Sequence, residues 1–213
     1  MSTTTRLTSE EEIDYPESDG EPMAENTVQY DWITTIKGGL DVVFRHNPNV
    51  FVAGDLFWYP VRGMKPIRRA PDVMVAFGRP KGPRRSYLQW REGGIAPQVV
   101  FEILSPSNRG PELALKFQFY ETHRVEEYYI YNPDPEHLEL SGFCRKGDDL
   151  IEIASMNGHV SPRLKVRFDM SGVGLQIIRP DGRPFLTYEE IALQEELARK
   201  NAEWERQRAD QEW

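Results

Sequence analysis

The chain has 213 residues, of which 39% are hydrophobic and 28% are charged, and it contains a single cysteine, Cys144. A chain of this length and composition is typical of a globular protein with one sizeable core. No stretch approaches the roughly 20 apolar residues of a membrane helix, and the acidic start MSTTTRLTSEEEIDY lacks the apolar region of a secretory signal. Because a lone cysteine excludes an intramolecular disulfide and a cysteine-based zinc site, we expect a cytoplasmic protein that does not associate with membranes.

The formal net charge of −8 is unevenly distributed. Between Arg62 and Arg91 nine basic residues accompany one acid, Asp72, whereas the rest of the chain is acidic. A local positive block of this kind is what neutralisation of nucleic-acid phosphates uses, although an ordinary solvated loop explains it nearly as well. The basic residues of the block are Arg62, Lys65, Arg68, Arg69, Arg79, Lys81, Arg84, Arg85 and Arg91.

The first part of the chain predicts an acidic arm followed by a helix. Residues 1–26 hold eight acids and one base with few large apolar groups, which indicates a disordered arm outside the fold. From Asn26, apolar residues at helical spacing predict a helix that ends at Asn47-Pro48. Gly38 and Gly39 inside this helix cost about 1 kcal/mol each relative to alanine, so we expect tight packing there.

Three β-branched or aromatic runs follow, NVFVAGDLFWYP, APDVMVAF and APQVVFEIL, and they predict neighbouring strands. A second helix comes next, with Ser107 or Asn108 as N-cap candidates and Pro111 near its first turn. VEEYYIYNPD then predicts a strand, HLELSGFCRKGDDLIEIA a hairpin around residues 146–148, and LKVRFD and GLQIIRP later strands. The order predicts an α/β (α+β) fold, in which helices flank a mixed central sheet that carries a β-rich extension.

Residues 188–213 are rich in helix-forming and charged residues and contain few apolar positions. This pattern predicts a charged C-terminal helix that the core of the domain cannot bury. A partly solvated tail and a weak coiled coil with a second subunit both fit, because the apolar heptad is too sparse to decide.

The segment QVVFEILSPSNR predicts a strand with one charged residue, Glu102. Glu102 lies inside an apolar run typical of a strand buried on both faces, where an unpaired carboxylate costs several kcal/mol. Asp72, near the start of the preceding strand, would meet Glu102 if both side chains face the same side. Two carboxylates are common ligands of Mg²⁺. Lys116 and Tyr120, four residues apart on the following helix, could point back to these strand ends.

Each of these residues also has a plain structural explanation. Asp72 could cap the start of a strand, and Glu102 could form a buried salt bridge with Lys116 or an arginine. Lys116 could simply pack its alkyl stem on the helix surface, and Tyr120 could belong to the core. Asp55, in VAGDLFWYP, could approach the same site, although such a residue more often marks a turn or bulge.

The segments PDV, VFEILSPSNR, LALKFQFY and VEEYYIYNPD resemble the Uma-two domain family, restriction-endonuclease-like proteins of the PD-(D/E)XK nuclease superfamily. The resemblance runs from about Trp32 to Asp181, and its Glu-x-Leu-Ser-Pro-Ser segment is fairly specific. It implies a restriction-endonuclease-like core, and we expect that domain to span residues 27–187.

The resemblance also implies roles for individual residues. It makes Asp72 and Glu102 metal ligands, with the main-chain carbonyl of Ile103 as another. The superfamily places its lysine two residues after the glutamate, where this chain has the apolar Leu104. The lysine role therefore passes to Lys116 on the following helix.

The implied activity is hydrolysis of DNA phosphodiester bonds by water activated at Mg²⁺ or Mn²⁺. Lys116 would orient that water or stabilise the developing charge, with Asp55 and Tyr120 as accessory candidates. Because nucleases often cut two strands, and because the C-terminal helix is exposed, we also expect a homodimer. The residues expected to hold flanking phosphates are Arg68, Arg69, Arg79, Lys81, Arg84 and Arg85.

Two other functions stay open. An apolar Leu104 at the usual lysine position would fit a catalytically inactive nucleic-acid-binding or scaffolding module with the same fold. A hydrolase that uses Asp72 and Glu102 as acid and base without metal would resemble a glycosidase. Metal-independent binding without turnover would favour the first, and activity in excess chelator the second.

Overall fold

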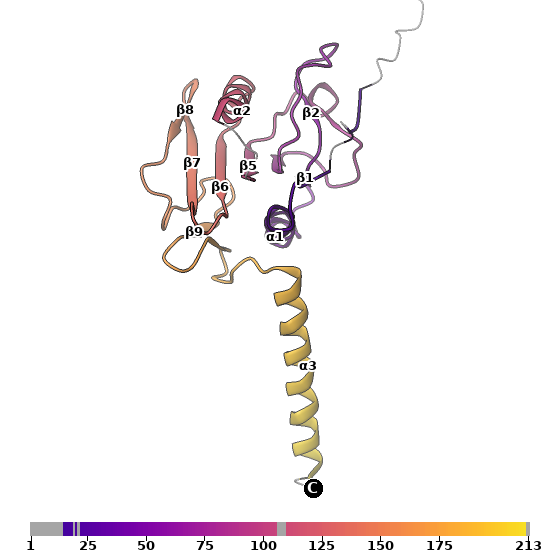
Figure 1. Cartoon of the computed structure of the whole chain (residues 1–213). Helices are drawn as coiled ribbons and strands as arrows, with labels where there is room; N and C mark the ends of the chain where they lie inside the picture. Colours follow the sequence, from indigo (N-terminus) through magenta and orange to yellow (C-terminus); the bar gives the residue numbers. More distant parts are fainter. Residues whose placement is uncertain (1–14, 19, 21, 106–109, 212–213) are drawn as a thin grey trace, which may run out of the picture.

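The computed structural model describes residues 15–18, 20, 22–105 and 110–211, with side chains to residue 208. Helices and strands follow one another largely in the predicted order (Figure 1). The first half comprises α1 (Thr27–Val43), β1 (Val50–Gly54), β2 (Trp58–Tyr59), β3 (Val73–Phe77), β4 (Tyr87–Leu88), a 3₁₀ turn (Gln89–Arg91) and β5 (Val99–Ile103). The second half comprises α2 (Gly110–Thr122), β6 (Glu127–Asn132), β7 (Glu139–Lys146), β8 (Asp149–Glu152), β9 (Arg167–Asp169), β10 (Gln176–Ile178) and α3 (Tyr188–Gln211).

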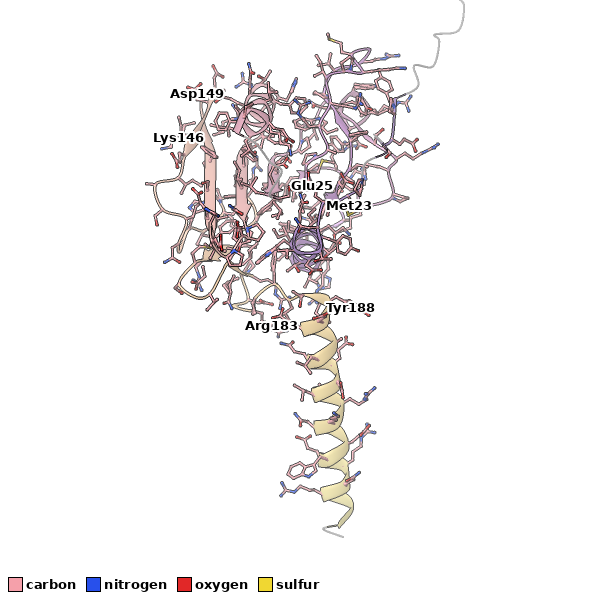
Figure 2. The ribbon with its side chains drawn as sticks, viewed as in Figure 1. Met23, Glu25, Lys146, Asp149, Arg183 and Tyr188 are labelled. Atoms are coloured by element: carbon pink, nitrogen blue, oxygen red, sulfur yellow. The ribbon has the colours of Figure 1, made fainter. Side chains whose placement is uncertain are left out.

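The central sheet has six strands in the order β1-β3-β5-β6-β7-β8. Strands β5 and β6 are parallel, whereas the other neighbours are antiparallel, so the predicted mixed sheet is confirmed. The predicted hairpin is β7–β8, in which Lys146 pairs with Asp149 and Gly147 adopts a φ of 64° that favours glycine. Figure 2 labels both paired residues at the tip of this hairpin.

The strands β1, β3, β5 and β6 are buried on both faces of the sheet, and side chains alternate between these faces along each strand. One face packs against α1 and the β-rich extension, and the other packs against α2 and β2. The α1 face includes Val73, Val75, Val99, Phe101, Ile33, Ile36, Leu40 and Phe168. The α2 face includes Met74, Ala76, Val100, Tyr128, Tyr120 and Trp58.

Helix α1 begins after Asn26, whose side chain accepts a hydrogen bond from the backbone N–H of Gln29 at 2.9 Å. The expected tight packing holds at Gly39 only: a Cβ atom there would lie 2.3 Å from the ring of Phe185, whereas Gly38 faces open space. The apolar Val28 is 49% exposed, whereas the polar Gln29 beside it is buried.

The described part of the acidic arm contacts the domain through Tyr15 and Pro16. The hydroxyl of Tyr59 donates to the carbonyl of Pro16 at 2.6 Å, and the N–H of Gly63 donates to the hydroxyl of Tyr15 at 2.6 Å. The Tyr15 ring also lies 5.0 Å from the ring of Trp90, centroid to centroid. Residues 1–14 and the N-cap candidates Ser107 and Asn108 lie outside the described residues.

Helix α3 projects from the domain as a single rod (Figures 1 and 2). Its start carries a capping box, because Thr187 Oγ1 accepts from the Glu190 N–H and Glu190 Oε2 accepts from the Thr187 N–H. Leu193, Leu197 and Trp204 are each more than half exposed, as expected for a helix that its own core does not cover. No helix in the described ranges is long and apolar enough to cross a membrane.

Candidate functional site

Asp72 and Glu102 lie side by side on the α2 face of the sheet. Strands β3 and β5 pair Val73 with Phe101, and one further step in this antiparallel register places Asp72 opposite Glu102. Both are buried, with relative exposures of 9% and 1%. Residues directly opposite each other in such a pair have Cβ atoms about 4.5–5.5 Å apart. The two carboxylates therefore meet on a shared face.

Two side chains of α2 hold the carboxylate of Glu102. Lys116 Nζ donates to Oε2 at 2.8 Å, and the hydroxyl of Tyr120 donates to Oε1. These residues are neighbours on one helical face because they are four positions apart. The Trp58 ring stacks on that of Tyr120 with centroids 6.4 Å apart and fixes its orientation. The predicted approach of Lys116 and Tyr120 to this strand is thus present.

Fewer hydrogen-bond donors stabilise the buried carboxylate of Asp72 than that of Glu102. Its Oδ2 accepts a hydrogen bond from the N–H of Ile103 at 2.6 Å. Burial raises the pKa of Asp72 well above its usual range, and the Glu102 carboxylate raises it further. Among the described residues, the cluster brings together two carboxylates and the ammonium of Lys116. The salt bridge therefore explains the burial of Glu102, and within the described ranges no cation pairs directly with Asp72.

The titration of the two α2 side chains limits what they can do. Burial alone would lower the pKa of Lys116, but the Glu102 carboxylate outweighs burial and raises the pKa above its usual value. Burial and Glu102 together raise the pKa of the Tyr120 hydroxyl. Lys116 is consequently a permanent ammonium and Tyr120 a neutral hydrogen-bond donor, so neither can act as a general base near neutral pH.

Two residues that the sequence interpretation missed adjoin the carboxylates. Gln29 Nε2 donates to the carbonyl of Ile103 at 3.0 Å, which leaves this oxygen a second lone pair. The hydroxyl of Tyr128 is buried without a hydrogen-bond partner in the described part of the chain. Burial, Glu102 and Asp72 raise the pKa of Tyr128. A polar residue on the apolar side of α1 was the available signal for Gln29; nothing local distinguished Tyr128.

The donor set fits a hard divalent cation. Asp72, Glu102 and the carbonyl of Ile103 supply only oxygen atoms, which Mg²⁺ and Mn²⁺ prefer, and Lys116 is the one cation that pairs with these carboxylates in the described part of the chain. No group of three or more His, Cys, Asp or Glu residues gathers in a metal-binding arrangement within the ranges that the structure describes. A cation here would complete its coordination with water and substrate oxygens, as Mg²⁺ commonly does.

Asp55, the expected accessory acid, occupies a turn beside Asp72. Its backbone has a φ of 45°, a left-handed conformation that aspartate tolerates better than most residues. Its N–H lies within hydrogen-bond distance of the carbonyls of Pro71 and Asp72, at 3.2 and 3.3 Å. The negative charge of Asp55 contributes to the raised pKa of Asp72. The turn at Asp55, which the sequence offered as the alternative to a role in the site, is present, and it lies next to the carboxylates.

The predicted phosphate-binding residues separate into two groups. Arg79 and Arg84 share one acid, with their Nε atoms 2.8 and 2.7 Å from the two carboxylate oxygens of Glu92. Burial would raise the pKa of Glu92, but the two arginines lower it overall. Arg85 pairs with Glu17. These three guanidinium groups are therefore engaged within the chain.

The other predicted phosphate-binding residues are Arg68, Arg69 and Lys81. The Arg68 guanidinium lies 5.0 Å from the ring centroid of Phe57, and that of Arg69 lies 5.4 Å from the ring centroid of Phe119. Lys81 is exposed. The positive block is thus partly neutralised and partly seated on aromatic rings.

A family comparison supports a nuclease-like assignment. The family model Uma2, described as "Putative restriction endonuclease", matches residues 5–165, so the match begins inside the arm that we expected outside the fold. A crystal structure from Anabaena variabilis, described as a "putative nuclease belonging to DUF820", is 13% identical with a TM-score of 0.46. The alignment covers 67% of this chain and 74% of that chain. No curated protein shows a significant match. Because the family model spans well over half of the sequence, this chain belongs to the Uma2 family.

Proposed function

We propose that this protein is an endonuclease that hydrolyses DNA phosphodiester bonds with the help of Mg²⁺ or Mn²⁺. Asp72, Glu102 and the carbonyl of Ile103 would hold the cation. The observation that carries this proposal is the charge imbalance of the buried cluster, in which two carboxylates face one ammonium among residues 15–18, 20, 22–105 and 110–208. A divalent cation supplies the missing positive charge, and membership of the Uma2 family supports the choice of reaction.

The bound cation would polarise the phosphoryl oxygen and lower the pKa of a water molecule. The chain's own residues then have distinct tasks. Lys116 remains an ammonium and stabilises negative charge that develops on the phosphate. Tyr120 fixes one oxygen of Glu102, and the N–H of Ile103 fixes one oxygen of Asp72, so the carboxylates are held before substrate arrives.

The proposal extends to the partners of the protein. Arg68, Arg69 and Lys81 would contact DNA phosphates, whereas Arg79 and Arg84 would mainly hold their loop through Glu92. Nucleases often cut the two strands of a duplex with two sites, and the exposed apolar side chains of α3 could join two copies as a homodimer. A cytoplasmic location, expected from the lone cysteine, belongs to the same proposal.

A second candidate is an inactive nucleic-acid-binding module. It is favoured by one specific observation: Lys116 and Tyr120 occupy both carboxylate oxygens of Glu102, as a purely structural salt bridge would require. Leu104 at the usual lysine position of the superfamily agrees with that alternative.

Calorimetric titration with Mg²⁺ and Mn²⁺, together with plasmid cleavage, tests the proposal. Wild-type protein should bind metal and cut DNA, and Asp72→Asn and Glu102→Gln should do neither while remaining folded. Wild-type protein that binds DNA without metal binding or cleavage would establish the inactive module. Cleavage that persists in excess chelator would contradict metal dependence and point to acid/base hydrolysis.

A further inference from the structure

Arg69 lies on the same side of the molecule as the candidate carboxylates. It forms an antiparallel bridge with Trp58, in which each backbone N–H donates to the other residue's carbonyl, at 2.7 and 3.2 Å. Residues paired in this way direct their side chains to the same side. Trp58 stacks on Tyr120, whose hydroxyl donates to Glu102. Two side chains therefore connect the position of Arg69 to the site.

The guanidinium of Arg69 is held in a defined place. It lies 5.4 Å from the ring centroid of Phe119, and its Nη1 donates to the carbonyl of Arg68 at 2.8 Å. Phe119 is itself wedged between Trp58 and His123, with ring centroids 5.2 and 4.6 Å away. An arginine stacked in this way loses little further conformational entropy when it binds a ligand.

Arg69 differs from Arg79 and Arg84 because no carboxylate contacts it among residues 15–18, 20, 22–105 and 110–208, a property that it shares with Arg68 on the ring of Phe57. Arg79 and Arg84 are paired with Glu92 at 2.8 and 2.7 Å. A half-buried guanidinium without a counter-charge, and with N–H donors beyond its one backbone bond, is suited to an anion. Its planar fork matches the oxygens of a phosphate group.

We infer that Arg69, seated on Phe119, forms a phosphate subsite that binds the DNA backbone next to the phosphate being cut. The inference deepens the proposed function and rests on it. Lys116 and Phe119 are three positions apart on α2, so the residue that seats Arg69 is a neighbour of Lys116 on the helix surface. DNA carries one phosphate per roughly 3.4 Å of rise on each strand. A cation seated beside the site can therefore contact a phosphate next to the one being cut.

Fluorescence anisotropy with a fluorescein-labelled 20-base-pair duplex, in chelator to prevent cleavage, tests this subsite. Arg69→Gln should weaken binding by about 10-fold or more, the usual effect of one charge-assisted hydrogen bond. The slope of log affinity against log salt concentration should fall by about one phosphate contact. Arg69→Lys should lie between the two, because the charge remains and the planar fork is lost.

Arg45→Gln is the matched control, since it removes one exposed positive charge just beyond the end of α1, the helix on the other face of the sheet. It should leave affinity and salt slope at wild-type values. The inference is overturned if wild-type protein binds the duplex and Arg69→Gln binds it equally with the same slope. Absence of binding by wild-type protein would instead refute the proposed function, and this subsite with it. Thermal unfolding of each variant establishes that any loss is not loss of fold.

Discussion

Two buried glutamates lie on the neighbouring central strands β5 and β6, and they have different surroundings. Glu102 is 1% exposed on the α2 face, and Glu127 is 2% exposed on the opposite face. Glu127 accepts hydrogen bonds from the Tyr129 hydroxyl at 2.8 Å, the Arg163 N–H at 2.5 Å and the Ser161 hydroxyl. These neutral donors attach the β-rich extension to the sheet.

The difference lies in what accompanies each carboxylate. Glu102 has Asp72 opposite it and an ammonium beside it, whereas Glu127 stands opposite Val99 and Cys144. Burial of a glutamate is therefore not by itself a sign of chemistry. A second carboxylate with too little positive charge nearby distinguishes the candidate site from the structural one.

The largest expected effect separates the two glutamates by activity. Glu102→Gln should lower cleavage of plasmid DNA by about 1,000-fold or more, because loss of a ligand charge removes electrostatic stabilisation of the transition state. Glu127→Gln, the matched change on the neighbouring strand, should leave cleavage within about twofold of wild type. Equal loss of cleavage in both variants, with both folded, would mean that the two glutamates do not differ in function.

Loss of Glu127 should appear as a loss of stability. Glu127→Ala leaves three donors without their acceptor and should lower the free energy of unfolding by roughly 3 kcal/mol, since each unsatisfied buried group costs about 1–3 kcal/mol. Urea denaturation measures this change. A variant as stable as wild type would mean that Glu127 does not hold the extension.

Asp72 should lower the free energy of unfolding of the metal-free protein near neutral pH. Its folded-state pKa is raised, so the carboxyl contributes favourably below its unfolded pKa, and that contribution is lost as pH rises through the folded value. Asp72→Asn keeps an acceptor for the Ile103 N–H and should raise the free energy of unfolding by roughly 1–3 kcal/mol near neutral pH. Its advantage over wild type should grow from acidic to neutral pH in urea titrations without metal. A variant that is less stable than wild type throughout that range would contradict an uncompensated Asp72.

The smallest expected effect concerns Gln29. Gln29→Leu removes the donor that orients the Ile103 carbonyl and should weaken Mg²⁺ binding by about 10-fold, a usual effect of a residue that supports a ligand. Calorimetry measures the change, and Gln118→Leu, an exposed position on α2, serves as the control. Unchanged affinity in Gln29→Leu would mean that this carbonyl does not contact the cation.

Sequence reasoning predicted the α/β fold, the mixed sheet and the meeting of Asp72 with Glu102, because strand periodicity decides which side chains share a face. It missed Glu127, since VEEYYIYN places two acids at the start of a strand and local sequence does not reveal which one is buried. The roles of Asp72, Glu102 and Lys116 in metal binding and catalysis stay predictions.

Other misses have equally local causes. The buried side chain of Gln29 on α1 donates a hydrogen bond to the carbonyl of Ile103, which lies 74 positions away in the chain. The positive block was bounded at Arg91, one residue before Glu92, which neutralises two of its members. Contacts of this kind depend on tertiary structure, which neither composition nor periodicity contains.

Helix α3 makes the molecule behave mechanically as a body with a lever. Its 24 residues extend about 36 Å at 1.5 Å per residue. A rotation of the domain by roughly 20° about the base of that helix would displace the far end by about 12 Å at this length. A molecule attached near Gln211 would therefore move a long way when the domain rotates by a small angle. It would also stay at a nearly constant distance from the domain, set by the length of α3.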